Sequence, residues 1–263
     1  MISELTQLAI KAAIEASRDI LAIYKSDDFE IEIKKDKSPL TKADKAAHKI
    51  ISSILKESKI PILSEEGKSI PYETRKYWNK LWIVDPIDGT KEFIKRNGEF
   101  TVNIALIKNN KPVIGVILAP DSGVLYFSEK NLGAFKSKTN LKDFNAEKFL
   151  AEAIPLPLNH KNQTFTVVAS RSHLSRETEA YIEDLIEKYG EVNFISKGSS
   201  LKLCMMAEGK ANCYPRFAPT MEWDTAAGQA ICEAAGLKVI DFKTKKSMIY
   251  NREELLNNWF TVF

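Results

Sequence analysis

The sequence feature that most restricts the fold is a continuous apolar run at residues 81–84, which leads directly into the hexapeptide DPIDGT at residues 85–90. The run predicts a buried strand, and such a strand does not normally end in two carboxylates, because each charge must be solvated or paired. Proline restricts the turn after Asp85, so the carboxylates of Asp85 and Asp88 and the carbonyl of Ile87 can point into one pocket. These are hard oxygen ligands, the type that magnesium requires. The alternative is an ordinary Asp/Gly turn with surface acids, which suits a bare D-x-x-D better than the full hexapeptide.

The residues on either side of this motif extend the prediction. Gly89 lets the chain approach a ligand closely, and the amides near Gly89 and Thr90 could open a helix aimed at a phosphate. Upstream, Glu65 and Glu66 follow a second short apolar run at residues 60–63. A double Glu alone usually means surface acids. Beside the hexapeptide we expect Glu65 to be a metal ligand, because it lies nearer the strand end, with Glu66 supporting it.

Two further acids stand at predicted helix starts. Asp224 begins a predicted helix whose small residues at 226–228 would let it pack tightly and bring Asp224 into the interior. The alternative role of N-cap does not exclude metal contact. Thr41 and Asp44 have the spacing of a capping box. The sharper interpretation is that Asp44 accepts a proton, through the Thr90 hydroxyl, from an attacking water.

The order of predicted elements divides the chain into two halves. Residues 1–155 contain two amphipathic helices, a half-buried strand at 29–33 and an antiparallel meander at 100–135, which is an α+β pattern. Residues 163–263 alternate strands and helices, which is typical of an α/β arrangement. Residues 155–163 are interpreted as a linker. We therefore predict an α/β fold with an N-terminal α+β domain and a C-terminal α/β domain that contributes Asp224.

Composition limits the class of protein. The chain has 263 residues, 44% of them apolar, and a formal net charge of +3, which falls short of the basic excess of a nucleic-acid binder. Scattered lysines such as Lys34 are interpreted as solvated surface charges. Cys204, Cys213 and Cys232 have no CxxC spacing, so we expect buried thiols in a reducing compartment. Residues 1–25 show no signal peptide and no run could span a membrane, which favours a cytoplasmic protein.

The hexapeptide, the Glu65-Glu66 pair and the segment WDTAAG at residues 223–228 resemble the three signature motifs of the inositol monophosphatase superfamily. The resemblance extends from residue 37 to residue 236. Within the superfamily, three stretches are most similar to the bacterial 3′(2′),5′-bisphosphate nucleotidases, which remove the 3′-phosphate from adenosine 3′,5′-bisphosphate. These stretches are residues 168–173, 197–202 and 214–224. The resemblance implies a layered αβαβα sandwich of the sugar-phosphatase type, with the site between its halves.

The resemblance also implies a ligand set for two magnesium ions. The implied ligands are Glu65, Asp85 and the Ile87 carbonyl for the ion that activates water, and Asp85, Asp88 and Asp224 for the ion that stabilises the leaving oxygen. A third, weaker magnesium near Glu65 and inhibition by lithium are common in such enzymes. Thr90, polarised by Asp44 and assisted by Glu65, would orient the water.

Substrate contacts are expected on both sides of the reacting phosphate. The predicted contacts are Glu65, Ile87, Asp88, Gly89, Thr90 and Asp224 at the metal end, and Ser170, Arg171, Ser199, Ser200, Lys202 and Arg216 for the second phosphate. For this second group the alternative is that they are solvated basic residues or turn residues.

Two other functions stay open. The nearest is another phosphatase of the superfamily, acting on inositol monophosphate or fructose 1,6-bisphosphate. The other is a non-catalytic nucleotide sensor, against which the complete ligand set and the Thr90–Asp44 pair argue. The expected partner is a small-molecule nucleotide and not a nucleic acid. The oligomeric state, monomer or homodimer, and peripheral association with the inner membrane stay open.

Overall fold

The computed structural model describes residues 2–26, 29–34, 39–141, 145–158, 164–169 and 175–263. Its helices are α1 (Glu4–Tyr24), α2 (Lys42–Leu55), the short 3-10 turn η1 (Lys56–Ser58), α3 (Tyr72–Arg75), α4 (Thr90–Ile94), α5 (Ala146–Ala151), α6 (Arg176–Tyr189), α7 (Leu201–Ala207) and α8 (Glu222–Ala234). Its strands are β1 (Glu32–Ile33), β2 (Pro39–Leu40), β3 (Ile62–Ser64), β4 (Lys80–Asp88), β5 (Thr101–Lys108), β6 (Lys111–Ala119), β7 (Val124–Glu129), β8 (Gly133–Lys138), β9 (Ile154–Leu156), β10 (Phe165–Ala169), β11 (Val192–Ser196), β12 (Tyr214–Arg216), β13 (Val239–Asp241) and β14 (Phe260–Val262).

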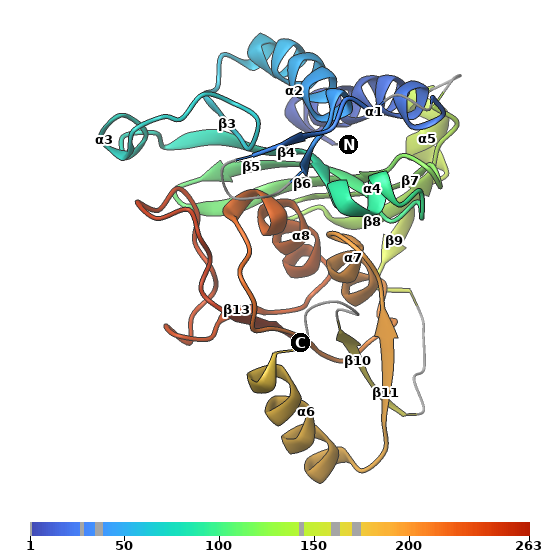
Figure 1. Ribbon diagram of the computed structural model, residues 1–263, viewed down its shortest axis with the longest axis vertical. Helices are drawn as coiled ribbons and strands as arrows, with labels where there is room; N and C mark the ends of the chain where they lie inside the picture. The colour runs from blue at the N-terminus through green and yellow to red at the C-terminus, as the bar shows by residue number, and fades with distance from the viewer. Residues whose placement is uncertain (1, 27–28, 35–38, 142–144, 159–163, 170–174) are drawn as a thin grey trace.

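The central sheet has the strand order β3-β4-β5-β6-β7-β8-β9. β3 runs parallel to β4, whereas the remaining neighbours are antiparallel, which confirms the predicted meander. α1 and α2 cover one face, and α8, with α7 beside it, covers the other (Figure 1). The middle strands β4, β5 and β6 are buried along most of their length because both faces of the sheet are covered.

A second layer of strands lies beyond α7 and α8, and α6 closes its outer side (Figure 1). In this layer β10 and β11 pair in parallel, while β12, β14 and β13 form an antiparallel sheet. A bridge between Val167 and Cys213 joins the two groups. The layers therefore alternate from α1 and α2 at one end to α6 at the other, which confirms the predicted α/β fold and its αβαβα sandwich.

The structure differs from the sequence-based expectations in three places. The half-buried strand expected at residues 29–33 is reduced to β1, which pairs with β2, because only Phe29 packs against the core and residues 30–33 are exposed. The segment interpreted as a linker begins inside β9, which extends the central sheet, and its residues 159–163 lie outside the described ranges. No pattern predicted β14, a three-residue strand that exists because β12 and β13 pair with it on both sides.

α8 lies close to the sheet because small residues face one another. A Cβ atom on Gly115 of β6 would lie 2.4 Å from the carbonyl oxygen of Ala227. On the opposite side of α8, a Cβ on Gly228 would lie 2.2 Å from a terminal carbon of Leu203 in α7. The small residues at 226–228 thus let α8 fit between the sheet and α7, as predicted.

In the part of the chain that the structure describes, no helix combines the length and apolar content needed to cross a bilayer. The three cysteines are buried and free, as expected of packing residues. Burial raises the pKa of the Cys213 thiol to about 11, so this side chain stays protonated at neutral pH.

We expect Gly115→Ala to destabilise the protein by about 1–3 kcal/mol, because the added methyl group has to push α8 away from β6. Urea denaturation measures the loss. Gly236→Ala is the matched control: no atom lies within 4 Å of its Cβ, so only the backbone strain of its positive φ, about 1 kcal/mol, is expected. Equal stability of Gly115→Ala and the parent would contradict the close approach of α8.

Candidate active site

The first two acids of the site are placed by a pair of parallel strands. Ser64 of β3 lies opposite Val84 of β4, and the backbone N–H of Glu65 donates to the carbonyl of Val84 at 3.1 Å. Because parallel strands end at the same edge of a sheet, Glu65 and Asp85 emerge side by side. The two carboxylates lie close enough for Glu65 to raise the pKa of Asp85, and a proton or a cation between them would relieve their repulsion.

A β-bulge brings Asp88 to the same face as Asp85. Asp85 pairs with Asn103 and Asp88 pairs with Thr101, so three steps along β4 match two steps along β5. In a regular strand, residues three apart point to opposite faces, and the extra residue restores the common direction. After Asp88 the chain turns at Gly89, whose φ of 93° favours glycine, and α4 begins at Thr90.

Asp224 reaches the site from the first turn of α8. The helix begins at Glu222, two residues earlier than predicted, so Asp224 is not the N-cap. Instead its Oδ2 accepts the backbone N–H of Met221, the N-cap residue, at 2.9 Å. The other carboxylate oxygen is left for a further partner.

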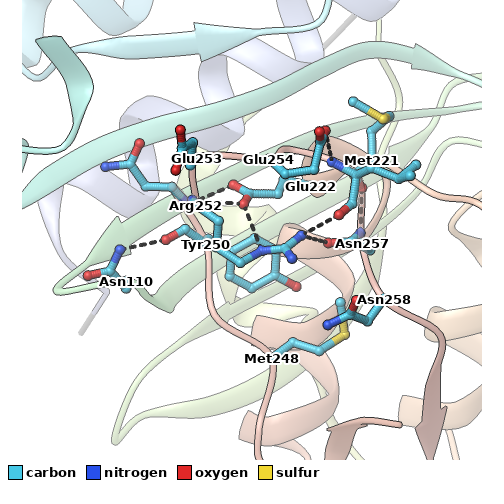
Figure 2. A network of polar contacts seen from close by, with 12 residues as sticks. Asn110, Met221, Glu222, Met248, Tyr250, Arg252, Glu253, Glu254, Asn257 and Asn258 are labelled. Carbon is cyan, nitrogen blue, oxygen red and sulfur yellow. Dashed lines mark hydrogen bonds and ion pairs between the residues drawn. The ribbon is translucent and has the colours of Figure 1, made fainter. Parts of the chain in front are cut away.

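The segment that follows Met248 holds the start of α8 in place (Figure 2). Glu222, which is fully buried, accepts the backbone N–H groups of Asn251 at 2.6 Å and Arg252 at 3.0 Å. Asn257 donates to the carbonyl of Met221 at 2.8 Å. These bonds immobilise the helix turn that positions Asp224.

The carboxylates raise one another's pKa. Burial, followed by the charges of Glu65, Asp88 and Asp224, raises the pKa of Asp85 well above its usual range. Burial raises the pKa of Asp88 to about 6, against the opposing effect of Lys202, and burial and the charge of Asp88 raise that of Asp224 to about 8. Among the described residues, the Oδ1 atom of Asp85 is buried and has no hydrogen-bond partner. An all-oxygen cluster of this kind fits a hard divalent cation such as magnesium.

The carboxylates of the site do not surround a single common point. Within the described ranges, no group of three or more His, Cys, Asp or Glu side chains is arranged, as it stands, to hold a metal ion. Glu65 contacts Asp85 on one side and the ammonium group of Lys34, at 2.8 Å, on the other. Lys34 also pairs with Glu66. The prediction that Lys34 is a solvated surface charge is therefore wrong: its cation neutralises part of this acidic cluster.

Thr90 and Asp44 form the pair that the sequence suggested. The Thr90 hydroxyl lies 3.3 Å from Asp44 Oδ1 and 3.3 Å from the carbonyl oxygen of Ile87. Asp44 Oδ2 accepts the backbone N–H of Thr41 at 2.7 Å and its hydroxyl at 2.6 Å. Asp44 therefore completes a capping box and also contacts Thr90. Burial raises the pKa of Asp44.

A cavity extends from the carboxylates into the second half of the chain. Its walls include the acids Asp88 and Asp224 and the basic residues Lys197, Lys202 and Arg216. Gly89, Ser199 and Ser200 also line it, together with Glu92, Glu99, Gly198, Leu203, Tyr214, Thr220, Thr225 and Phe260. The predicted contacts Ser170 and Arg171 lie outside the described residues.

Two basic residues that line this cavity have polar atoms shielded from water. Lys202 is 7% exposed and donates to the carbonyl oxygens of Lys197 at 3.0 Å and Ser199 at 2.8 Å. Burial lowers the pKa of Lys202 to about 8. The Nε atom of Arg216 is buried without a hydrogen-bond partner among the described residues. Arg216 itself is half-buried and lines the cavity, where its charged guanidinium is suited to an anionic ligand.

Sequence reasoning missed Lys34, Glu99 and Asn103. Glu99 accepts the backbone N–H of Gly198 at 2.8 Å, so it holds the loop that lines the cavity. Asn103 lies 3.4 Å from Asp88 Oδ2 through its Nδ2 atom. A polar residue inside the otherwise apolar run at 102–107 was the available signal for Asn103. No local pattern marks Lys34 or Glu99.

Comparisons with known proteins show what the chain resembles. Residues 1–261 match the profile described as Inositol monophosphatase family. The 3′(2′),5′-bisphosphate nucleotidase CysQ of Salmonella typhimurium is 44% identical over 265 residues, covering 100% of this chain and 99% of that protein. The protein of the same description from Escherichia coli K12 is 42% identical with the same coverage. The crystal structure of CysQ from Bacteroides thetaiotaomicron has a TM-score of 0.89 and 51% identity, over 98% of this chain and 96% of that one.

We expect the thermal stability of the protein in EDTA to fall as the pH rises from 6 to 8. The folded-state pKa values of Asp88 and Asp224, about 6 and about 8, lie above the unfolded value of about 4. The folded state therefore binds more protons in this window, and stability is lost as the pH rises through it. In this window Asp224 contributes about 2–4 °C per pH unit to Tm, whereas Asp88 has lost most of its contribution once the pH exceeds about 6.

Magnesium should reduce this slope, because a bound cation favours the ionised carboxylates. Differential scanning fluorimetry across the pH range, with EDTA or with magnesium, measures both slopes. Asp224→Asn removes one titrating group and should flatten the slope in EDTA. Identical slopes with and without magnesium would count against a cation at this cluster.

Proposed function

Because this chain belongs to the inositol monophosphatase family, we propose that it is a magnesium-dependent 3′(2′),5′-bisphosphate nucleotidase that converts adenosine 3′,5′-bisphosphate to AMP and phosphate. The observation that supports this most directly is that one cavity is lined by the acids Asp88 and Asp224 and by the basic residues Lys202 and Arg216. A substrate with two phosphates would place one beside the acids, through bound cations, and the other beside the basic residues. The full-length similarity to proteins described as 3′(2′),5′-bisphosphate nucleotidases supports the same substrate class.

We assign the magnesium ligands to the acids at the sheet edge. They are Glu65, Asp85, the carbonyl of Ile87, Asp88 and Asp224, a set with room for two ions and a third near Glu65. When bound, magnesium neutralises phosphate charge and lowers the pKa of water. The unpartnered Asp85 Oδ1 and the raised pKa values of Asp85, Asp88 and Asp224 are the features that such ions would relieve.

Thr90 and Asp44 handle the proton of the attacking water in this proposal. The Thr90 hydroxyl donates to Asp44 Oδ1, which leaves the Thr90 oxygen free to accept a hydrogen from water. As the water oxygen bonds to phosphorus, its proton passes to Thr90 Oγ1 and the Thr90 proton passes to Asp44. The phosphorus–oxygen bond to the sugar breaks, and the released alkoxide is protonated by solvent. Glu65, adjacent to Asp85, assists in orienting the water.

The basic residues of the cavity would hold the phosphate that does not react. Arg216 would donate through its guanidinium group, and Lys202 would supply a positive charge beside the Ser199 and Ser200 loop. Phosphoryl transfer requires mainly positioning and charge neutralisation, so this anchoring contributes to the rate as well as to affinity. Ser170 and Arg171 stay predicted contacts.

A phosphate-release assay on the purified chain tests the proposal. Adenosine 3′,5′-bisphosphate, inositol monophosphate and fructose 1,6-bisphosphate are compared by kcat/KM, with magnesium, with EDTA, and with magnesium plus lithium. We expect the adenosine bisphosphate to be preferred, with loss of activity in EDTA. Preference for either other substrate would assign the chain to a different phosphatase activity. Binding without any phosphate release would favour the nucleotide sensor.

We expect Asp88→Asn to lower kcat by at least ~10³, because a neutral amide does not replace an anionic metal ligand. Asp19→Asn, on the exposed face of α1, is the control and should leave kcat unchanged. Near-normal turnover of Asp88→Asn at saturating magnesium would remove Asp88 from the ligand set.

Arg216→Ala should raise KM for adenosine 3′,5′-bisphosphate by about 10–100-fold, because it removes a charged donor to the second phosphate. For a nucleoside monophosphate that lacks the second phosphate, KM should change little. Arg176→Ala, at the exposed start of α6, is the matched control. Equal effects of Arg216→Ala on both substrates would exclude Arg216 from the second phosphate site.

A further inference from the structure

A chain of buried polar side chains connects Asp88 with the loop that lines the opposite wall of the cavity. Asn103 Nδ2 lies 3.4 Å from Asp88 Oδ2, and its Oδ1 accepts the Ser200 hydroxyl at 2.8 Å. Ser200 Oγ in turn lies 2.8 Å from Thr101 Oγ1. We propose that Asn103 is a positioning residue for Asp88, and that through Ser200 it couples Asp88 to the cavity loop at residues 197–202. This inference rests on the role of Asp88 in the proposed function.

The chain has a single consistent direction. The carboxylate of Asp88 accepts, so the amide nitrogen of Asn103 must face it and the amide oxygen must face Ser200. That oxygen accepts the Ser200 proton, so Ser200 in turn accepts from the hydroxyl of Thr101. The Thr101 hydroxyl also lies 3.4 Å from Ser199 Oγ, a longer contact than its 2.8 Å to Ser200. Reversing Asn103 would place two acceptors against each other.

Burial makes these bonds specific. Thr101, Asn103 and Ser200 are at most 3% exposed, so water does not compete for their polar atoms. Asn103 lies in β5 opposite Asp85. The other residues of β5 between positions 102 and 107 are apolar. A buried amide without partners is unfavourable, so its two bonds to Asp88 and Ser200 account for its presence there.

Further contacts hold the cavity loop at residues 197–202 in place. The backbone of Ser200 also lies near Asp88 and lowers the pKa of its carboxyl group, so Ser200 is close to Asp88 as well as linked to it through Asn103. Glu99 holds Gly198, and Lys202 donates to the carbonyl of Ser199, whose φ is 47°. A ligand that moved this loop would change the bonds that orient Asp88. The contacts thus link the loop at residues 197–202 to Asp88.

Asn103→Leu tests the assignment, because leucine has a similar size and no polar atoms. Magnesium affinity without substrate is measured by isothermal titration and by the magnesium-induced rise in Tm. We expect the affinity to weaken about 10–100-fold, the usual effect of removing a residue that orients a metal ligand. In turnover, kcat should fall more than KM rises. Ser200→Ala, a smaller change, should show the same pattern with a smaller effect.

Val102→Ala is the structural control, because Val102 is buried in the core on the opposite face of β5. It should lower Tm and leave magnesium affinity unchanged. The double variant Asn103→Leu/Ser200→Ala should lose less affinity than the product of the single losses, since both interrupt one chain of bonds. Magnesium affinity of Asn103→Leu within about twofold of the parent, with Tm lowered as in Val102→Ala, would overturn the proposal.

Failure of the proposed function has a different signature. A parent chain that binds magnesium but prefers another phosphate ester would reject the nucleotidase assignment, and the affinity of Asn103→Leu would still decide the role of Asn103. A parent chain that binds no magnesium would overturn both.

Discussion

The structure depends on the burial of like charges at one edge of the central sheet. Asp85, Asp88 and Asp224 share a site with Glu65, and burial together with mutual repulsion raises the pKa values of all three aspartates. Such a cluster is unfavourable for folding unless a cation or bound protons neutralise it. Its presence in a well-packed core is therefore the strongest physical indication of function.

The surrounding elements hold these charges together against their repulsion. The parallel pair β3 and β4 places Glu65 beside Asp85, and the bulge in β4 turns Asp88 to the same face. Figure 2 shows how the residues after Met248 hold the start of α8, with Glu222 bound to two successive backbone N–H groups. Arg75 extends this network by donating to Asn251 at 3.1 Å, which connects α3 to α8. Residues from both halves of the chain therefore hold the acidic side chains in place.

Much of this arrangement could be predicted from local patterns. Apolar periodicity located α1, α2, the meander and α8, and the Thr41–Asp44 capping box is present as expected. The hexapeptide identified Asp85, Asp88 and Thr90 as neighbours because the residues are close along the chain. Glu65 and Asp224 are distant in sequence, and they were grouped with the hexapeptide because each acid follows an apolar run or begins a tightly packed helix; the superfamily resemblance then implied the same set.

The sequence by itself determined where strands end in acids, where helices are capped and which motifs the chain shares with a family of phosphatases. These properties follow from interactions between residues a few positions apart. Only the tertiary structure decided that Lys34 pairs with Glu65, that Asn103 contacts Asp88 and Ser200, and that β9 and β14 are strands. The physical reason is that each of these depends on burial and on partners far away along the chain, which leave no periodic or motif signal at the residue itself.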